Sequence, residues 1–175
     1  MHSDSFTAQE LRFERILDAP VEKVWDYLTD PELRALWFMG GPIDRHPGGR
    51  IYMTFDHDRL SDGDALMPDR YAANRGKQWF ETIIAYVPPR LLAYSWDNGD
   101  AGTVTFTLEP AGDGRTRLVL VHSGLRGPTD AKNFGGGWHS HLAVLDARLR
   151  GGRVENFWAI HAASEAKAAA ALEAS

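Results

Sequence analysis

Four strand-like runs joined by short turn segments constrain the fold of this chain more than any other feature. The runs are Gln78–Val87, Leu91–Trp96, Thr103–Leu108 and Thr116–His122. The breaks between them are rich in Pro, Asn, Asp and Gly, which favour turns because Pro presets φ and the others tolerate positive φ. Such short connections join antiparallel neighbours. The sequence therefore predicts consecutive antiparallel hairpins over residues 78–123.

Two further strands and two short helices precede these hairpins. Residues 10–19 and 50–57 alternate apolar with polar side chains, the pattern of a half-buried strand. Pro20 opens a helix over 21–28 whose apolar residues recur at i, i+3, i+4 and i+7. Asp30 and Pro31 then provide a cap and a first position for a second short helix that contains Leu33, Leu36 and Trp37.

A longer helix is expected after the glycine run at 135–137. Trp138, Leu142, Leu145 and Leu149 share one narrow stripe at 100° per residue, and Gly151-Gly152 ends the helix. The Ala-rich tail at 154–175 predicts a terminal helix because Ala has the highest helix propensity. Its apolar face is weak beyond residue 160, so we expect the tail to fray or to pack on a partner.

This order of elements predicts an α+β domain over residues 10–150, followed by a C-terminal helical extension at 151–175. A curved antiparallel sheet of six strands has one face to bury, and the long helix is the element that can cover it. Two short helices close one end. Because curvature holds the two layers apart, a concave site for a small molecule is expected between sheet and helix.

Composition excludes several classes of function. The 175 residues include no Cys, which excludes disulfides, thiolate metal sites and Cys nucleophiles. A net charge of −5 argues against a general nucleic-acid binder and against docking on an anionic membrane. No stretch approaches the roughly 20 apolar residues that would insert in a membrane, and the first ten residues contain no apolar run. We therefore expect a cytoplasmic protein.

Several motifs, in order along the chain, resemble the SRPBCC superfamily of START-like, helix-grip proteins. Within it they resemble the branch named after the heat-shock chaperone ATPase activator homologue. The opening is Phe13-Glu14-Arg15-Ile16-Leu17-Asp18-Ala19-Pro20-Val21-Glu22-Lys23-Val24-Trp25. The later motifs are Asp30-Pro31-Glu32-Leu33 with Trp37, Pro88-Pro89-Arg90-Leu91-Leu92 with Tyr94-Ser95-Trp96, Thr103-Val104-Thr105-Phe106, Thr116-Arg117-Leu118, His122-Ser123-Gly124 and Gly137-Trp138. The resemblance covers about residues 10–150 and implies the fold described above.

The resemblance implies three kinds of function. Members of the superfamily include lipid carriers, hormone receptors, aromatase/cyclases and hydroxylase components. We expect a module that holds a small hydrophobic or aromatic molecule between sheet and helix. The alternatives are a cyclase, dehydratase or hydrolase that works in the same cavity, and a partner that stimulates a chaperone ATPase. The Ala-rich tail is a candidate surface for a homodimer.

Large side chains from nearly every element are expected to line the cavity, since Trp and Tyr offer apolar area together with one polar atom. The candidates are Trp37, Phe55, Trp79, Tyr94, Trp96, Phe106, Trp138 and Leu142. A shift of one residue in a strand would turn its side chains to the other face.

Three residues are candidates for acid–base chemistry. His122 ends the last strand, and His141 lies about 60° from Trp138 on the long helix. If the two imidazoles converge, they could serve as a proton shuttle or a polar anchor near neutral pH. Glu81 would be a desolvated acid if its strand face is concave, and a solvated charge if that face is convex. The alternative for each His is a position on the surface or at a strand end, without a role in catalysis or binding.

Metal and cofactor sites are not expected. His139 and His141 lie about 200° apart around the helix, too far to chelate one ion. The acidic residues between 56 and 69 do not follow a calcium-loop spacing, so they predict a solvated loop. The glycines at 135–137 lack a phosphate-binding context and are interpreted as a hinge or a cavity entrance.

Overall fold

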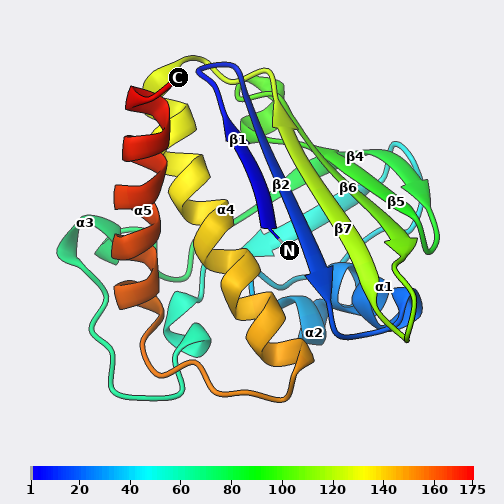
Figure 1. Cartoon of the computed structure of the whole chain (residues 1–175). Helices are drawn as coiled ribbons and strands as arrows, with labels where there is room; N and C mark the ends of the chain where they lie inside the picture. Colours follow the sequence, from blue (N-terminus) through cyan, green and yellow to red (C-terminus); the bar gives the residue numbers. More distant parts are fainter. Residues whose placement is uncertain (1) are drawn as a thin grey trace.

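The computed structural model describes residues 2–175 and shows one curved antiparallel sheet packed against two long helices (Figure 1). The sheet has seven strands in the order β1-β2-β7-β6-β5-β4-β3. Their bounds are β1 His2–Phe6, β2 Glu10–Leu17, β3 Arg50–Thr54, β4 Gln78–Val87, β5 Leu91–Ser95, β6 Thr103–Pro110 and β7 Thr116–Ser123. The predicted α+β class and the antiparallel hairpins from β4 to β7 are confirmed.

The predicted number of six strands is wrong, because β1 adds a seventh strand at the outer edge of β2. β1 carries no run of apolar residues, so alternation could not reveal it. It is held by main-chain pairing and by Asp4, whose carboxylate accepts a hydrogen bond of 2.5 Å from Arg15 on β2. Phe6 adds an edge-to-face contact with Phe13 at 5.4 Å.

Two short helices follow β2, as the sequence predicts. α1 spans Val21–Thr29 and buries one apolar stripe that includes Val24, Trp25 and Leu28. α2 spans Pro31–Arg34, where the Asp30 side chain accepts hydrogen bonds from two main-chain N–H groups. α2 is shorter than expected, because the chain passes into turns before Trp37.

The long helix α4 spans Pro128–Leu149, so it begins ten residues before Trp138. The glycines at 135–137 therefore lie inside a helix and do not precede it, whereas a role for this run as a hinge or cavity entrance stays a prediction. Close packing explains two of them. A Cβ on Gly135 would lie 2.9 Å from the Phe6 ring, and one on Gly136 would lie 2.7 Å from Cγ of Glu165. Gly has a low helix propensity, but the absence of a Cβ at these two positions lets β1 and α5 approach α4 closely.

The C-terminal helix α5 spans Phe157–Glu173 and packs alongside α4 over its length (Figure 1). The expected fraying beyond residue 160 is therefore not observed. Ser164 and Ala168 are buried, and small side chains let the two helices approach closely. The segment before β4 contains a single 3-10 turn, η1 at His57–Leu60, and the short α3 at Asp69–Ala72, which lies against α5. A second 3-10 turn, η2 at Asp97–Gly99, follows β5.

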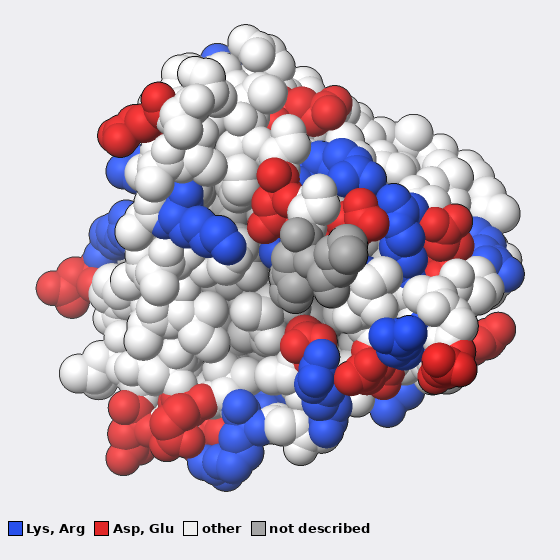
Figure 2. All heavy atoms as spheres, in the orientation of Figure 1, with Lys and Arg blue, Asp and Glu red and all other residues white. Residues whose placement is uncertain are grey.

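The core lies between the concave face of the sheet and α4. The stripe of Trp138, Leu142, Leu145 and Leu149 is buried there, as predicted. On the face seen in Figure 2, Lys and Arg are interspersed with Asp and Glu, and neither sign forms an extended patch. Within residues 2–175, every helix is too short or too polar to serve as a membrane span.

Candidate functional site

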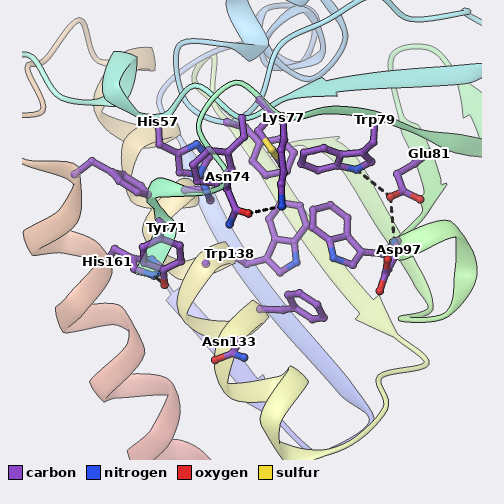
Figure 3. Close-up of a pocket in the computed structure, with 18 of the residues that line it drawn as sticks. His57, Tyr71, Asn74, Lys77, Trp79, Glu81, Asp97, Asn133, Trp138 and His161 are labelled. Atoms are coloured by element: carbon purple, nitrogen blue, oxygen red, sulfur yellow. Dashed lines mark hydrogen bonds between the residues drawn. The ribbon is translucent and has the colours of Figure 1, made fainter. Parts of the chain in front are cut away.

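A cavity of about 720 Å³ opens where the sheet and α4 separate (Figure 3). Its walls come from five parts of the chain: residues 38–39, the segment 55–77, β4 with the turn after β5, α4 from Asn133 to His141, and the start of α5. Its volume lies in the range of small-molecule sites. Residues far apart in the sequence therefore meet around one hollow.

Stacked and tilted aromatic rings form one wall of this cavity. The Trp96 ring lies 5.4 Å from Trp138 and 6.2 Å from Phe38, and Phe38 lies 5.0 Å from Trp138. Trp79 from β4 faces the same space and donates its indole N–H to Glu81 (Figure 3). Such a wall offers flat apolar area to an aromatic guest.

The candidate ligand residues divide into two groups in the structure. Phe55, Trp79, Trp96 and Trp138 line the cavity. The others, Trp37, Tyr94, Phe106 and Leu142, are buried in the core and are not part of its lining. Trp37, for example, donates its indole N–H to the carbonyl of Tyr27 at 2.7 Å, and its ring packs on Phe38. These side chains support the wall rather than form its surface.

Glu81 lies on the concave face and is 2% exposed. Its carboxylate accepts four hydrogen bonds: from Trp79, from the Ser95 hydroxyl, and from the main-chain N–H groups of Asp97 and Asn98. Because donors occupy both oxygens, the side chain fixes η2 against β4. Glu81 therefore holds η2 and the Trp79 ring in place, and its oxygen atoms have little capacity left for proton transfer.

His122 is buried and both of its ring nitrogens are engaged. Nδ1 accepts a hydrogen bond of 3.0 Å from the Trp138 indole, so Nε2 carries the proton and donates to the carbonyl of Ala101 at 2.8 Å. Burial lowers the pKa of His122, which keeps the ring neutral. His122 is not part of the cavity lining. The rings of Trp138 and Phe38 lie between His122 and His141, so the two imidazoles do not act as a pair. It orients the Trp138 ring.

His141 lines the inner end of the cavity together with His57, which the sequence did not single out as a site residue. Their ring centroids are 4.9 Å apart in an edge-to-face arrangement. His57 also stacks on Phe55 at 3.9 Å and contacts Trp158. Burial, with the neighbouring imidazoles, lowers the pKa of His57 to about 2, and burial lowers that of His141 to about 4. Both rings are therefore neutral near pH 7.

A polar network closes the side of the cavity between α3 and α5 (Figure 3). The Tyr71 hydroxyl lies 2.7 Å from Nε2 of His161, and Nδ1 of His161 lies 3.2 Å from the hydroxyl of Ser140. Glu165 binds both His161 and Arg70. Burial raises the pKa of Tyr71 to about 12 and lowers the pKa of His161. The network ties α3 to α5.

Lys77 extends over the cavity, where its ammonium donates a hydrogen bond of 3.0 Å to the Asn74 side chain (Figure 3). Lys77 is exposed. Over residues 3–175, whose side chains the structure describes, no group of three or more His, Asp or Glu side chains is arranged to hold a metal ion.

The model of the family described as Activator of Hsp90 ATPase homolog 1-like protein matches residues 18–150. The chain belongs to this family. The resemblance to the SRPBCC superfamily and its chaperone-activator branch is thereby confirmed. No curated protein matches the chain significantly.

Solved structures of similar proteins share the fold of this chain. A Bordetella parapertussis protein encoded by gene BPP1335 is 39% identical, with a TM-score of 0.78 over 92% of this chain and 85% of its own. CalU16 from Micromonospora echinospora is 21% identical, with a TM-score of 0.69 over 99% of this chain and 98% of its own. The Aha1 dimer from Colwellia psychrerythraea shares the fold at 16% identity, with a TM-score of 0.59 over 80% of this chain and 95% of its own.

The match to the Activator of Hsp90 ATPase homolog 1-like family ends before α5, whereas the cavity does not. Phe157, Trp158 and His161 complete its wall from beyond residue 150. Sequence reasoning missed these residues, and also Tyr71 and His57. The available signals were an aromatic pair at the start of the tail and a Tyr inside an otherwise polar stretch.

Proposed function

We propose that this protein binds a small aromatic or hydrophobic molecule in the cavity between the sheet and α4. The observation that supports this most directly is the hollow of about 720 Å³ with Trp79, Trp96 and Trp138 on its wall. A small domain normally fills its interior at close-packed density. Here large rings surround space instead of filling it, and Glu81 and His122 hold the indoles of Trp79 and Trp138 in place.

The two alternatives have less support. Enzymatic acid–base catalysis by His122 or Glu81 would need free proton-transfer atoms, and the hydrogen bonds of both side chains are already committed. His141 retains one free nitrogen, which serves binding as well as catalysis. A chaperone-activating role follows from the family description alone.

Gly137 allows a test that does not disturb the core. It lines the cavity, and a Cβ placed on it would meet nothing within 4 Å. Gly137→Leu therefore projects a side chain into open space while improving helix propensity. Ala143→Leu adds the same side chain to an exposed position of α4 and is the matched control.

The experiment is a thermal-shift and calorimetric screen of aromatic and lipid compounds against the three proteins. We expect compounds that stabilise the wild type and Ala143→Leu, and that lose most of their affinity for Gly137→Leu. Equal binding to all three proteins would place the ligand elsewhere. If no compound binds the wild type, the cavity is not a ligand site.

We further propose that two copies associate through α5, whose exposed side is lined by Ala159, Ala162, Ala163 and Ala166. The Colwellia relative with the same fold is described as a dimer. Light scattering should give twice the mass of 19.5 kDa for the wild type and the monomer mass for the double variant Ala163→Glu/Ala166→Glu. A monomeric wild type at high concentration would contradict this proposal.

A further inference from the structure

The inner end of the cavity presents two imidazoles that come from distant parts of the chain. His57 stands at the start of η1 and His141 in the middle of α4. They are 5% and 6% exposed, and their rings meet edge to face at 4.9 Å. Phe55, Phe157 and Trp158 surround His57, so the pair is enclosed by apolar rings on its other sides.

The hydrogen-bonding state of His141 follows from its partner. Nδ1 lies 2.8 Å from the main-chain oxygen of Trp37. A carbonyl oxygen can only accept, so Nδ1 carries the hydrogen. In the neutral ring Nε2 is then an acceptor, and no group within residues 3–175 donates to it. His141 thus offers one fixed acceptor to whatever occupies the cavity.

His57 differs from His141, because its ring makes no hydrogen bond to any side chain of residues 3–175 or to their main chain. Its Nδ1 is fully buried and has no partner. An unpartnered N–H is rarer in protein interiors than an unpartnered acceptor, which favours the tautomer with its hydrogen on Nε2. Since His57 lines the cavity, Nε2–H is a donor available to a ligand. A buried imidazole that is left unpaired is a feature that needs a functional explanation.

Charge decides which ligand group suits this donor and acceptor. The cationic residues of the lining, Arg70 and Lys77, are exposed, and Arg70 is already paired with Glu165. A carboxylate at the inner end would be desolvated beside two neutral rings without a counterion, which is unfavourable. A hydroxyl group is neutral, donates one hydrogen bond and accepts another.

We propose that the inner end of the cavity is a binding subsite for a hydroxyl group on an aromatic ligand, of the phenol class. The hydroxyl donates to Nε2 of His141, and its oxygen accepts from the ring N–H of His57. The aromatic body of the ligand lies against the indole wall. This inference rests on the proposed function and adds a ligand class to it.

The test compares three probes that differ in one group: para-phenylphenol, its methyl ether, and biphenyl-para-carboxylate. Their dissociation constants are measured by calorimetry for the wild-type protein and for His57→Phe and His141→Phe. We expect the wild type to bind the phenol about tenfold more tightly than the ether, since one buried hydrogen bond contributes about that factor. His141→Phe should bind phenol and ether within about twofold of each other, because the ether lacks only the O–H group that Nε2 of His141 accepts. His57→Phe should keep the preference for the phenol and should bind both probes about tenfold more weakly than the wild type, because the oxygen atom of each probe accepts from the ring N–H of His57. His57→Phe breaks no hydrogen bond, so it keeps the test usable if His141→Phe fails to fold.

The outcomes separate the two proposals. If phenol and ether bind the wild type equally, or if the carboxylate binds most tightly, the hydroxyl subsite is wrong although the cavity still binds aromatic molecules. If the preference for the phenol survives in His141→Phe, or if His57→Phe binds both probes as tightly as the wild type does, the hydroxyl is recognised elsewhere. If none of the three probes binds, the phenol class is overturned, and the Gly137→Leu comparison decides separately whether the cavity binds other molecules.

Discussion

Replacing His57 by Phe should make this protein more stable. Nδ1 of His57 is buried without a partner, and leaving such a group unsatisfied costs about 1–3 kcal/mol. Phe removes that polar atom and keeps the stacked contact with the Phe55 ring at 3.9 Å. The larger ring can extend into the adjacent cavity, so it is not expected to overpack the core. We therefore expect the free energy of unfolding at pH 7 to rise by about 1–2 kcal/mol.

A domain of this size shifts its Tm by about 2–4 °C for each kcal/mol, so the expected increase is about 2–8 °C. Urea unfolding and calorimetry measure the two quantities independently. The matched control is His122→Phe, because both nitrogens of His122 are bonded, to Ala101 and to Trp138. That variant leaves two buried partners unpaired and should lose about 1–3 kcal/mol. A Tm of His57→Phe at or below that of the wild type would refute the argument that His57 is kept at the expense of stability.

The remaining predictions concern acid sensitivity, the helix contact and the carboxylate anchor. The folded-state pKa values of His57 and His141, about 2 and about 4, lie below the unfolded value near 6.5, so only the unfolded chain takes up protons between them. The free energy of unfolding should therefore fall as the pH drops below about 6.5, by about 1.4 kcal/mol per pH unit for each group. Urea unfolding measured between pH 7.5 and pH 5 should show that this free energy depends less steeply on pH in His57→Phe than in the wild type. Gly136→Ala, whose Cβ would lie 2.7 Å from a side chain of α5, should lower the free energy of unfolding by about 1–3 kcal/mol. Gly137→Ala, whose Cβ meets nothing within 4 Å, should raise it by up to about 1 kcal/mol. Equal changes of the two variants in urea unfolding would contradict the packing explanation. Glu81→Gln turns an N–H group toward hydrogen-bond donors and should lower the free energy of unfolding by about 1–3 kcal/mol, so an unchanged midpoint in urea would show that the four hydrogen bonds do not act as an anchor.

The elements that could be predicted from the sequence are those whose burial repeats with a regular period. The stripe from Trp138 to Leu149 and the alternation in β4, β6 and β7 are of this kind, because one face of each element meets the core. β1 has no such pattern, and its main-chain pairing with β2 makes it part of the sheet. The glycines at 135–137 lower helix propensity, yet tertiary packing requires two of them within α4.

The candidate site was predicted only in part for a similar reason. Trp79 and Trp138 lie on periodic elements and Trp96 directly follows β5, so they could be predicted as lining residues, although the sequence left open which face of each strand meets the cavity. Tyr71 and His161 are 90 positions apart, and their contact depends on how α3 docks against α5. No local pattern encodes that docking, which is set by the network that includes Glu165.

The division of the cavity between two parts of the chain has a consequence for specificity. The strands β3 to β7 and α4 lie within the residues that match the family, and they supply Trp79, Trp138 and His141. α5 lies beyond the match and supplies Phe157 and Trp158, which enclose the unpaired His57. The enclosure by α5 keeps that imidazole neutral and out of water, because burial is the largest cause of its lowered pKa. In the proposed function, the family fold thus provides the hollow for the aromatic body of the ligand, and α5 encloses the inner end that receives its polar group.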